Sequence, residues 1–371
     1  MENTTNNSKT RSILTIAAFL LVMFGFVILN RAITPPDVSQ SERRQLAKLP
    51  TLTLQTLANA DFMDGFEDFA ADSFAFRENL RTLRAFAVLD VFRMSDKSGL
   101  YRADGGAGKF EPVNDKSILQ AADKIAKVAE TLGDVNIYYA VVPDKNIYVA
   151  PQTPGYEPAR VAALLAERLG AYTAIDLTDT LGGDAYYRTD LHWDQPRIAP
   201  VVDKLGAAMN FAPSADFETR TLGEFNGVYT GQLALPLTPD TMTYLENSAT
   251  VGATTQYFDI ASNGFLDGDM YDLEAFKGGD PYDLFLRGAQ PLITITNPDA
   301  QSNRELYLFR DSFSSSLAPL LAPYYSRITL IDLRYIDSRV LDQYVKFAPD
   351  SDVLFLYSSQ ILNNSAILNV S

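Results

Sequence analysis

Residues 305–335, ELYLFRDSFSSSLAPLLAPYYSRITLIDLRY, contain the pattern that decides the fold. The first part, ELYLFRD (305–311), is short and rich in apolar and aromatic residues, which predicts a strand. The segment SFSSSLAPLLAPYY (312–325) predicts a helix at its start, and RITLIDLRY (327–335) predicts a second strand. A strand, a helix and another strand in succession are typical of a parallel βαβ unit. We therefore expect part of a parallel sheet here.

The same alternation extends to both sides of this stretch. It predicts helices at DKSILQAADKIAKVAETLG (115–133), EPARVAALLAERLG (157–170), WDQPRIAPVVDKLGAAM (193–209) and SRVLDQYVKFA (338–348), and strands at VNIYYAVVPDKNIYV (135–149) and DVLFLYSS (352–359). Residues 212–300 contain repeated turn signals between β-branched and aromatic runs, which indicates a β-rich insertion. The prediction is an α/β fold with a mostly parallel sheet flanked by helices, in which ligands bind at the carboxyl ends of the strands.

Composition excludes several classes of site. The 371 residues include no cysteine and one histidine, so disulfides, thiol catalysis and multi-histidine metal sites are excluded. A calcium or magnesium site made of carboxylates alone is compatible with the composition, but the chain has no EF-hand-like spacing. We expect no metal and no cofactor. The net charge of −15 makes nucleic acid an unfavourable partner, because the chain repels phosphates.

An uncharged apolar run at 13–29 predicts a transmembrane helix, since at 1.5 Å per residue it is about 25 Å long. Lys9 and Arg11 precede it, which predicts a cytoplasmic N-terminus. The alternative is a cleaved signal peptide. The apolar run is longer than the usual signal core, and LNRAITPP (29–36) is a poor cleavage site, so the sequence favours an uncleaved anchor.

The expected organisation follows from this anchor. It comprises a cytoplasmic tail (1–11), a transmembrane anchor (12–30), a stem (31–60) and an extracytoplasmic domain (61–371) that contains the insertion at about 212–300. The protein is thus predicted to be a single-pass protein of the cell membrane. Within residues 61–94, apolar side chains such as Phe62, Phe66 and Phe69 recur at helical spacing, and we expect them to pack in a core.

The only histidine and the only tryptophan are adjacent in YYRTDLHWDQP (186–196). Asp190 lies two residues before His192, so in an extended segment both side chains point to the same face. A carboxylate in that place fixes the tautomer of an imidazole base. The alternative is that His192 and Trp193 form an ordinary buried pair.

Ser312 directly follows the predicted strand 305–311, at the start of a helix, where its hydroxyl would face the crevice at the sheet edge. A serine needs a base to act as a nucleophile, and His192 is the only imidazole. Helix N-terminal amides there would favour an oxyanion. The alternative role of Ser312 is a helix N-cap. The G-x-S-x-G motif of α/β-hydrolases is absent.

Several blocks together resemble the DHHW family of bacterial proteins, which is related to the SGNH hydrolase-like proteins of alginate O-acetylation (AlgX/AlgJ-like). These blocks are SERRQLAKLP (41–50), DSFAFREN (72–79), YYRTDLHW (186–193), YDLFLRGAQPLITI (282–295), LFRDSFSSSLAPLLAPYYSRITLIDLRYID (308–337) and DVLFLYSS (352–359). The resemblance covers most of the chain beyond residue 40.

The resemblance implies an SGNH-like α/β fold in which the D-x-H block precedes the serine. It also implies that Ser312, His192 and Asp190 are a catalytic triad. Leu191 stands where the family name has its first histidine, a place at which the related acetylation proteins vary. The glycine and asparagine of the classical SGNH oxyanion hole have no identified counterpart.

Three further residues are weaker candidates for substrate binding. Lys145 and Arg334 follow predicted strands and would bind a sugar hydroxyl, a carboxylate or an acyl oxygen. The alternatives are a solvated turn for Lys145 and an ion pair with Asp332 or Asp337 for Arg334. Trp193 would either bind a sugar ring or pack beneath the histidine loop.

The expected function is a membrane-anchored, serine-dependent O-acyltransferase that acetylates an exopolysaccharide or cell-wall glycan. The resemblance implies a membrane-bound O-acyltransferase as the acyl donor. The alternatives are a glycan O-acetylesterase, which uses the same triad with water, and a non-catalytic glycan-binding or scaffold protein. The enzyme hypotheses predict that His192 lies about 3 Å from both Ser312 and Asp190.

Overall fold

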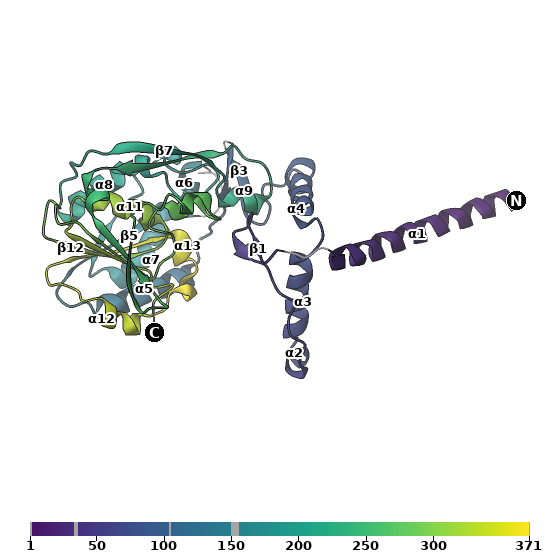
Figure 1. Ribbon diagram of the computed structural model, residues 1–371, viewed down its shortest axis with the longest axis horizontal. Coiled ribbons are helices and arrows are strands. Elements are labelled where there is room, and N and C mark those ends of the chain that lie inside the picture. Colours follow the sequence, from purple (N-terminus) through teal and green to yellow (C-terminus); the bar gives the residue numbers. More distant parts are fainter. Residues whose placement is uncertain (1, 33–35, 104, 150–155, 371) are drawn as a thin grey trace. The chain divides into compact units, whose positions relative to one another are not determined.

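The computed structural model describes residues 2–32, 36–103, 105–149 and 156–370 (Figure 1). The chain forms two compact units. The first comprises residues 1–94 and 231–235, and the second comprises residues 95–230 and 236–371.

The first unit is mainly helical. Its elements are α1 (Glu2–Ala32), a two-stranded antiparallel ribbon of β1 (Val38–Ser39) and β2 (Arg44–Gln45), α2 (Leu54–Ala58), α3 (Asp61–Asp72), and α4 (Arg77–Phe86), which continues into a π-helical turn (Ala87–Val91). Within the described part of the chain, no helix is both long and apolar enough to cross a membrane.

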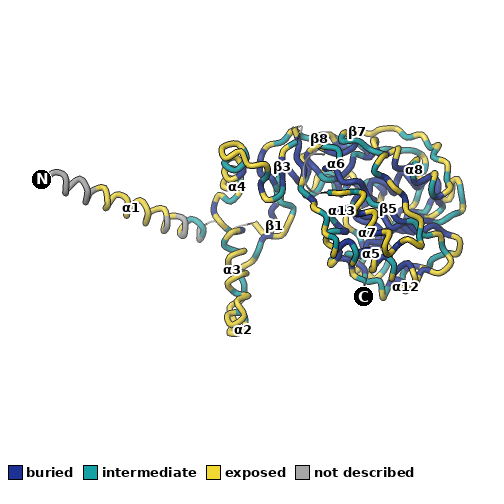
Figure 2. The backbone as a smooth tube through the Cα atoms, turned by 180° about the vertical axis from the view of Figure 1, so that it is seen from behind, coloured by how far each residue is buried: buried dark blue, intermediate teal, exposed yellow. Residues whose placement is uncertain are grey.

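The apolar stripe of residues 61–94 does not form a core within the first unit, so that expectation is wrong. Phe66 is 41% exposed, Leu83 61% and Phe92 71%, and Figure 2 shows α2 to α4 as mostly exposed. Helical spacing places these side chains on common faces, but no second layer of the unit covers them. Asp72 in the same unit is buried in a polar contact: its carboxylate accepts hydrogen bonds from the Arg44 guanidinium at 2.6 and 2.7 Å, and Arg44 holds the pKa of Asp72 down at about 2.

The second unit is built around an eight-stranded sheet with the order β10-β9-β11-β13-β12-β14-β5-β6. These strands are β5 (Asn136–Val142), β6 (Thr173–Ile175), β9 (Thr254–Asp259), β10 (Gly264–Gly268), β11 (Leu292–Thr296), β12 (Glu305–Arg310), β13 (Arg327–Ile331) and β14 (Asp352–Ser358). The five strands from β13 to β6 are parallel, and β11, β9 and β10 continue the sheet in antiparallel pairs. A mostly parallel sheet is thereby confirmed.

Both faces of this sheet are buried, because side chains alternate along each strand. On β12, Leu306 and Leu308 pack with α8 (Ala199–Met209) and α11 (Phe313–Leu321). The opposite face packs against α5 (Asp115–Ala129) and α7 (Pro158–Leu169). Figure 1 shows these two helix pairs on opposite sides of the sheet. The prediction of a sheet flanked by helices is therefore confirmed.

The remaining elements are short and lie at the ends of the strands or in connections. They are β3 (Leu100–Ala103) paired with β4 (Gly106–Lys109), β7 (Glu218–Phe225) paired with β8 (Asp240–Glu246), the helices α6 (Asn146–Val149), α9 (Val228–Leu233), α10 (Ser248–Gly252), α12 (Leu341–Tyr344) and α13 (Ser359–Leu362), and single 3₁₀ turns at 183–185, 195–197, 275–277, 281–284, 338–340 and 365–367.

The segment 212–300 has two different parts. β7 and β8 form a separate antiparallel ribbon, as an insertion would. β9, β10 and β11 instead extend the main sheet beyond β13, so this part of the segment belongs to the sheet. The β-rich character of the segment is confirmed, and its final strands belong to the central architecture.

Candidate active site

Ser312 lies between the carboxyl end of β12 and the first turn of α11. It occupies the N-cap position of this helix, but its side chain makes no capping hydrogen bond. The adjacent Asp311 takes that role: its Oδ1 accepts from the Phe313 amide at 3.0 Å, and its Oδ2 accepts from the Ser358 amide at 2.6 Å. The Ser312 hydroxyl is therefore not needed to cap the N-terminus of α11.

The Ser312 hydroxyl instead belongs to a chain of three side chains. Ser312 Oγ lies 2.7 Å from His192 Nε2, and His192 Nδ1 lies 2.7 Å from Asp190 Oδ1. Asp190 is 1% exposed and His192 is 7% exposed. Both distances are within the hydrogen-bond reach that a nucleophile, a base and its orienting carboxylate require.

The loop that bears Asp190 and His192 is tight, and backbone contacts join its two ends. Tyr186 pairs with Trp193 in an isolated antiparallel bridge, and the Tyr187 amide donates to the His192 carbonyl at 3.1 Å. The second Asp190 oxygen accepts from the Val228 amide at 2.9 Å. Each Asp190 oxygen thus has its own donor, which fixes the plane of the carboxylate.

A second aspartate, Asp240, holds the middle of this loop. Its Oδ1 accepts from the Arg188 amide at 2.8 Å, and its Oδ2 accepts from both the amide and the hydroxyl of Thr189, at 2.7 and 2.6 Å. Asp240 is the first residue of β8, so the β7–β8 ribbon supports the loop.

The imidazole itself is packed between aromatic rings. The Tyr282 ring stacks on the His192 ring with centroids 3.8 Å apart and planes at 7°, and the Phe313 ring lies 4.8 Å away. Ser316, one helical turn after Ser312, accepts from the Tyr282 hydroxyl and from Trp193 Nε1, both at 2.8 Å. These contacts fasten the histidine loop to the helix that begins at Ser312.

The structure gives Trp193 a packing role. The side chain is fully buried, and its Nε1 is shared between Ser316 Oγ and the Phe313 carbonyl, the latter at 3.1 Å. A substrate cannot reach a ring in that position, so the sugar-platform hypothesis for Trp193 is wrong and the packing alternative holds.

Lys145 and Arg334 are both engaged within the protein. The Lys145 ammonium is buried and has four backbone carbonyls within 3.1 Å, which take up all three of its donors. No donor of Lys145 is left for a substrate, so the substrate-binding hypothesis for this residue is wrong, and the alternative of a solvated turn is not observed either. Arg334 donates to both oxygens of Asp332, at 2.9 and 2.6 Å, which is the ion pair expected as the alternative to substrate binding.

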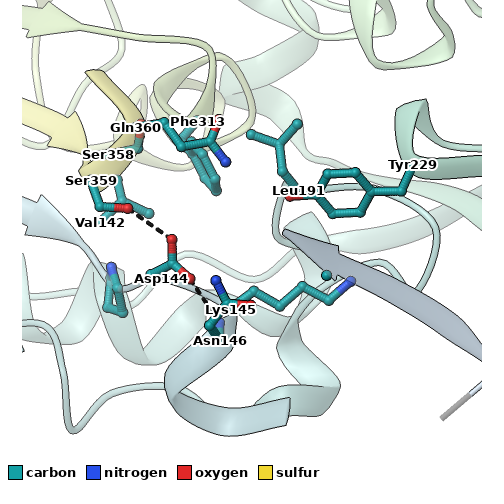
Figure 3. Close-up of a pocket in the computed structure, with 12 residues that line it drawn as sticks. Val142, Asp144, Lys145, Asn146, Leu191, Tyr229, Phe313, Ser358, Ser359 and Gln360 are labelled. Carbon is teal, nitrogen blue, oxygen red and sulfur yellow. Dashed lines mark hydrogen bonds between the residues drawn. The ribbon is translucent and has the colours of Figure 1, made fainter. Parts of the chain in front are cut away.

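A small pocket adjoins the site at the carboxyl ends of β5 and β14 (Figure 3). It is lined by Leu191 from the histidine loop, Phe313 from α11, Gln360 from α13 and Tyr229 from α9.

The amides at the start of α11 are already used within the protein. The Phe313 amide donates to the Asp311 carboxylate, and the Ser314 amide donates to the Asp311 carbonyl. These two helix amides are therefore not free to bind an oxyanion.

Sequence reasoning did not identify Asp240 or Tyr282 as parts of this site. Both lie in the segment 212–300, where the sequence shows local turn signals but does not indicate which distant residues each side chain contacts. A signal existed for Tyr282, because the block YDLFLRGAQPLITI (282–295) begins with it. No local pattern distinguishes the buried Asp240 from the many exposed aspartates of an acidic chain.

We expect Gly227→Ala to disturb the site strongly. An added Cβ would lie 2.4 Å from the Thr189 carbonyl oxygen and 2.5 Å from Asp190 Cβ, so Asp190 must move. A misplacement of about 1 Å near a reacting centre can cost about 100-fold in rate, and we expect that loss in the rate of covalent labelling of Ser312. Gly279→Ala is the matched control, because nothing lies within 4 Å of its added Cβ. Equal labelling rates in both variants would contradict the prediction.

No protein-family model matches the chain, and no curated protein matches it. Solved structures do match. A DHHW family protein from Eubacterium siraeum is similar over 74% of this chain and 95% of its own, with 19% identity and a TM-score of 0.60. PatB1 from Bacillus cereus is similar over 71% of this chain and 96% of its own, with 18% identity and a TM-score of 0.57. A second PatB1 structure, with a sulfonyl adduct, gives 18% identity and a TM-score of 0.58 over 73% of this chain and 98% of its own. The chain therefore has the fold of this DHHW family protein and of PatB1.

Proposed function

We propose that the protein is a membrane-anchored, extracytoplasmic serine O-acyltransferase that moves an acetyl group to a hydroxyl of an exopolysaccharide or cell-wall glycan. In this proposal Ser312 is the nucleophile, His192 is the general base and acid, and Asp190 orients His192. The observation that carries the proposal is the hydrogen-bonded order Asp190–His192–Ser312, with 2.7 Å at each step.

The first half of the reaction forms an acyl-serine. His192 Nε2 accepts the hydroxyl proton of Ser312 as Ser312 Oγ attacks the acetyl carbonyl of the donor. The Asp190 carboxylate accepts a hydrogen bond from the Nδ1–H group, which keeps its proton, and stabilises the imidazolium that forms. When the tetrahedral intermediate collapses, the donor's leaving oxygen takes the proton from Nε2, and the acetyl ester of Ser312 remains.

The second half reverses these roles with a new acceptor. A glycan hydroxyl gives its proton to His192 Nε2 and attacks the acetyl-serine carbonyl, and collapse returns the proton to Ser312 Oγ. If water is the acceptor, the same residues perform O-acetyl ester hydrolysis. Transfer therefore requires a surface that binds the glycan while water is excluded from the ester.

The anchor and the location are part of the proposal and rest on the sequence. Residues 13–29 carry no charge, and apolar side chains of α1 such as Leu21 and Ile28 are 75% and 68% exposed. With the N-terminus in the cytoplasm, residues beyond 32 would face the glycan. The acyl donor on that side would be a membrane-bound O-acyltransferase, because acetyl-coenzyme A is cytoplasmic.

The experiment that tests the proposal combines an acyl donor with defined acceptors. The full-length protein would be incubated with p-nitrophenyl acetate, with and without hydroxylated oligosaccharides. We expect a burst of nitrophenol, one added acetyl in the intact mass, and an acetylated peptide that contains Ser312. A sulfonyl fluoride should label the same peptide, since PatB1, which has this fold, has been solved with a sulfonyl adduct.

The fate of the acetyl group separates the candidate functions. Appearance of acetyl-oligosaccharide identifies a transferase, whereas release of acetate alone identifies an esterase. A folded protein that forms neither the acetyl nor the sulfonyl adduct at Ser312 would contradict both enzyme functions and favour a glycan-binding or scaffold protein.

A further inference from the structure

We propose that Lys145 is a positioning residue of the active site: its buried ammonium gathers the backbone carbonyls of the loop that bears Asp190 and His192 and holds that loop in its catalytic shape. This inference rests on the proposed function for its catalytic meaning. The geometry on which it depends is local to the second unit.

The ammonium of Lys145 has four backbone acceptors. Lys145 Nζ lies 2.6 Å from the Tyr187 carbonyl oxygen, 3.0 Å from that of Arg188 and 3.1 Å from that of Asp190. The fourth acceptor, at 2.9 Å, is the Ala107 carbonyl on β4. Three of the four therefore belong to the few residues that lead into His192, and one of them is the carbonyl of Asp190 itself.

Such an arrangement requires a cation. Neighbouring carbonyl dipoles that point at one place repel one another unless a donor with several hydrogens lies between them, and an ammonium has three. Asp240 performs the complementary task on the same loop, because its carboxylate binds the Arg188 and Thr189 amides. The loop is thus held by a cation at its carbonyls and an anion at its amides.

The place of Lys145 in the fold explains how it reaches the loop. It follows the carboxyl end of β5 and directly precedes α6. In Figure 3 its side chain runs away from the neighbouring Asp144, whose carboxylate accepts instead from the Ser359 hydroxyl at 2.8 Å. The ammonium also lies 5.5 Å from the centre of the Tyr229 ring.

Burial makes this cation sensitive to alkaline pH. Desolvation lowers the pKa of Lys145 to about 8, against the opposing effect of Asp190, Asp240 and Asp144. The ammonium is therefore lost as the pH rises through about 8, and a neutral amine has only two donors for four carbonyls. Of the neighbouring groups, the Arg188 side chain is paired with Asp240 at 3.5 Å. Burial raises the pKa of Tyr229, whose ring faces the ammonium, well above its ordinary value, and Glu111 acts on Tyr229 in the same direction.

The test uses the single histidine and the single tryptophan of the full-length protein. Because the chain has one histidine, NMR spectra of protein labelled with ¹⁵N-histidine contain the signals of one imidazole. The downfield ¹H signal of the proton between His192 Nδ1 and Asp190 therefore reports on this pair directly. In Lys145→Met we expect this signal to broaden or vanish and sulfonyl fluoride labelling of Ser312 to slow about 100-fold. Trp193 fluorescence should show that the core remains folded.

Lys124→Met is the matched control. Lys124 Nζ also donates to two backbone carbonyls, those of Ser365 and Leu368, but these lie in the C-terminal segment away from the loop. We expect Lys124→Met to keep the histidine signal and the labelling rate of the wild type. If Lys145→Met does not fold, the wild type is decisive, since its histidine signal should fade as the pH rises through about 8.

The two proposals fail in different ways. An unchanged histidine signal and a labelling rate within about twofold of the wild type in Lys145→Met would overturn the positioning role. So would a wild-type signal that stays constant between pH 7 and pH 10. Absence of any acyl or sulfonyl adduct in the wild type would overturn the catalytic function alone, because the histidine signal still measures what Lys145 does to the loop.

Discussion

Ser312→Ala should form no acetyl adduct and should slow p-nitrophenyl acetate turnover by at least about 10³-fold. In the proposed mechanism the Ser312 oxygen holds the acyl group, so its removal should leave only the catalysis that substrate binding and nearby dipoles provide. Stability should be little affected, because the side chain makes no capping bond and Asp311 binds the Phe313 amide instead. The measurement is the burst amplitude together with the intact mass.

Ser314→Ala is the matched control for this prediction. It removes a hydroxyl two residues further along the same helix, and Ser314 Oγ has no hydrogen-bond partner in the described part of the chain. We expect this variant to acylate at the rate of the wild type. Retention of the acetyl adduct in Ser312→Ala would show that another nucleophile carries the acyl group.

Local patterns were sufficient to predict the central architecture. The strands at 305–311 and 352–359 and the helices at 115–133 and 157–170 correspond to β12, β14, α5 and α7. Their periodicity matches their burial, since both faces of a parallel strand are apolar and each helix has one apolar face. The predicted helix at 338–348 is shorter in the structure, where a 3₁₀ turn precedes only the four residues of α12.

The exposed stripe of the first unit shows where periodicity stops being informative. Apolar residues at helical spacing indicate a common face, but they do not indicate what covers that face. Phe66 and Leu83 remain exposed because no further layer of that unit packs on α3 and α4. Sequence spacing therefore predicted the helices and not their burial.

The residues of the candidate site were likewise only partly predictable from the sequence. Asp190 and His192 are two residues apart and Ser312 follows a predicted strand end, which made all three candidates, and the resemblance to the DHHW family implied that they act together. Tyr282 contacts His192 across 90 positions of sequence, and only the folded chain shows that contact. The loop around Asp190 is held by groups from β4, β8, α9 and the end of β5, none of which a local pattern can relate.

Asp190→Asn should slow acylation of Ser312 by about 10³- to 10⁴-fold while leaving the three side chains in place. Both Asp190 oxygens accept hydrogen bonds, one from His192 Nδ1 and the other from the Val228 amide. An asparagine has one oxygen and one NH₂ group, so one of these two donors loses its acceptor in either orientation. If the oxygen turns to Val228, the NH₂ group donates to Nδ1 and forces the imidazole proton onto Nε2. Nε2 is then unable to accept the proton of Ser312.

The ¹⁵N shifts of the single histidine would show this change of tautomer directly. Asp352→Asn is the matched control, because Asp352 is also fully buried and forms an ion pair with Arg304. It lies at the amino end of β14, whereas the candidate site lies at the carboxyl ends of the strands. We expect Asp352→Asn to lower the thermal midpoint and to keep the acylation rate, whereas Asp190→Asn should change the tautomer and the rate together. An Asp190→Asn variant that keeps the Nδ1-protonated tautomer yet loses the rate would show that the negative charge of Asp190, and not the orientation it imposes, is what the imidazolium requires.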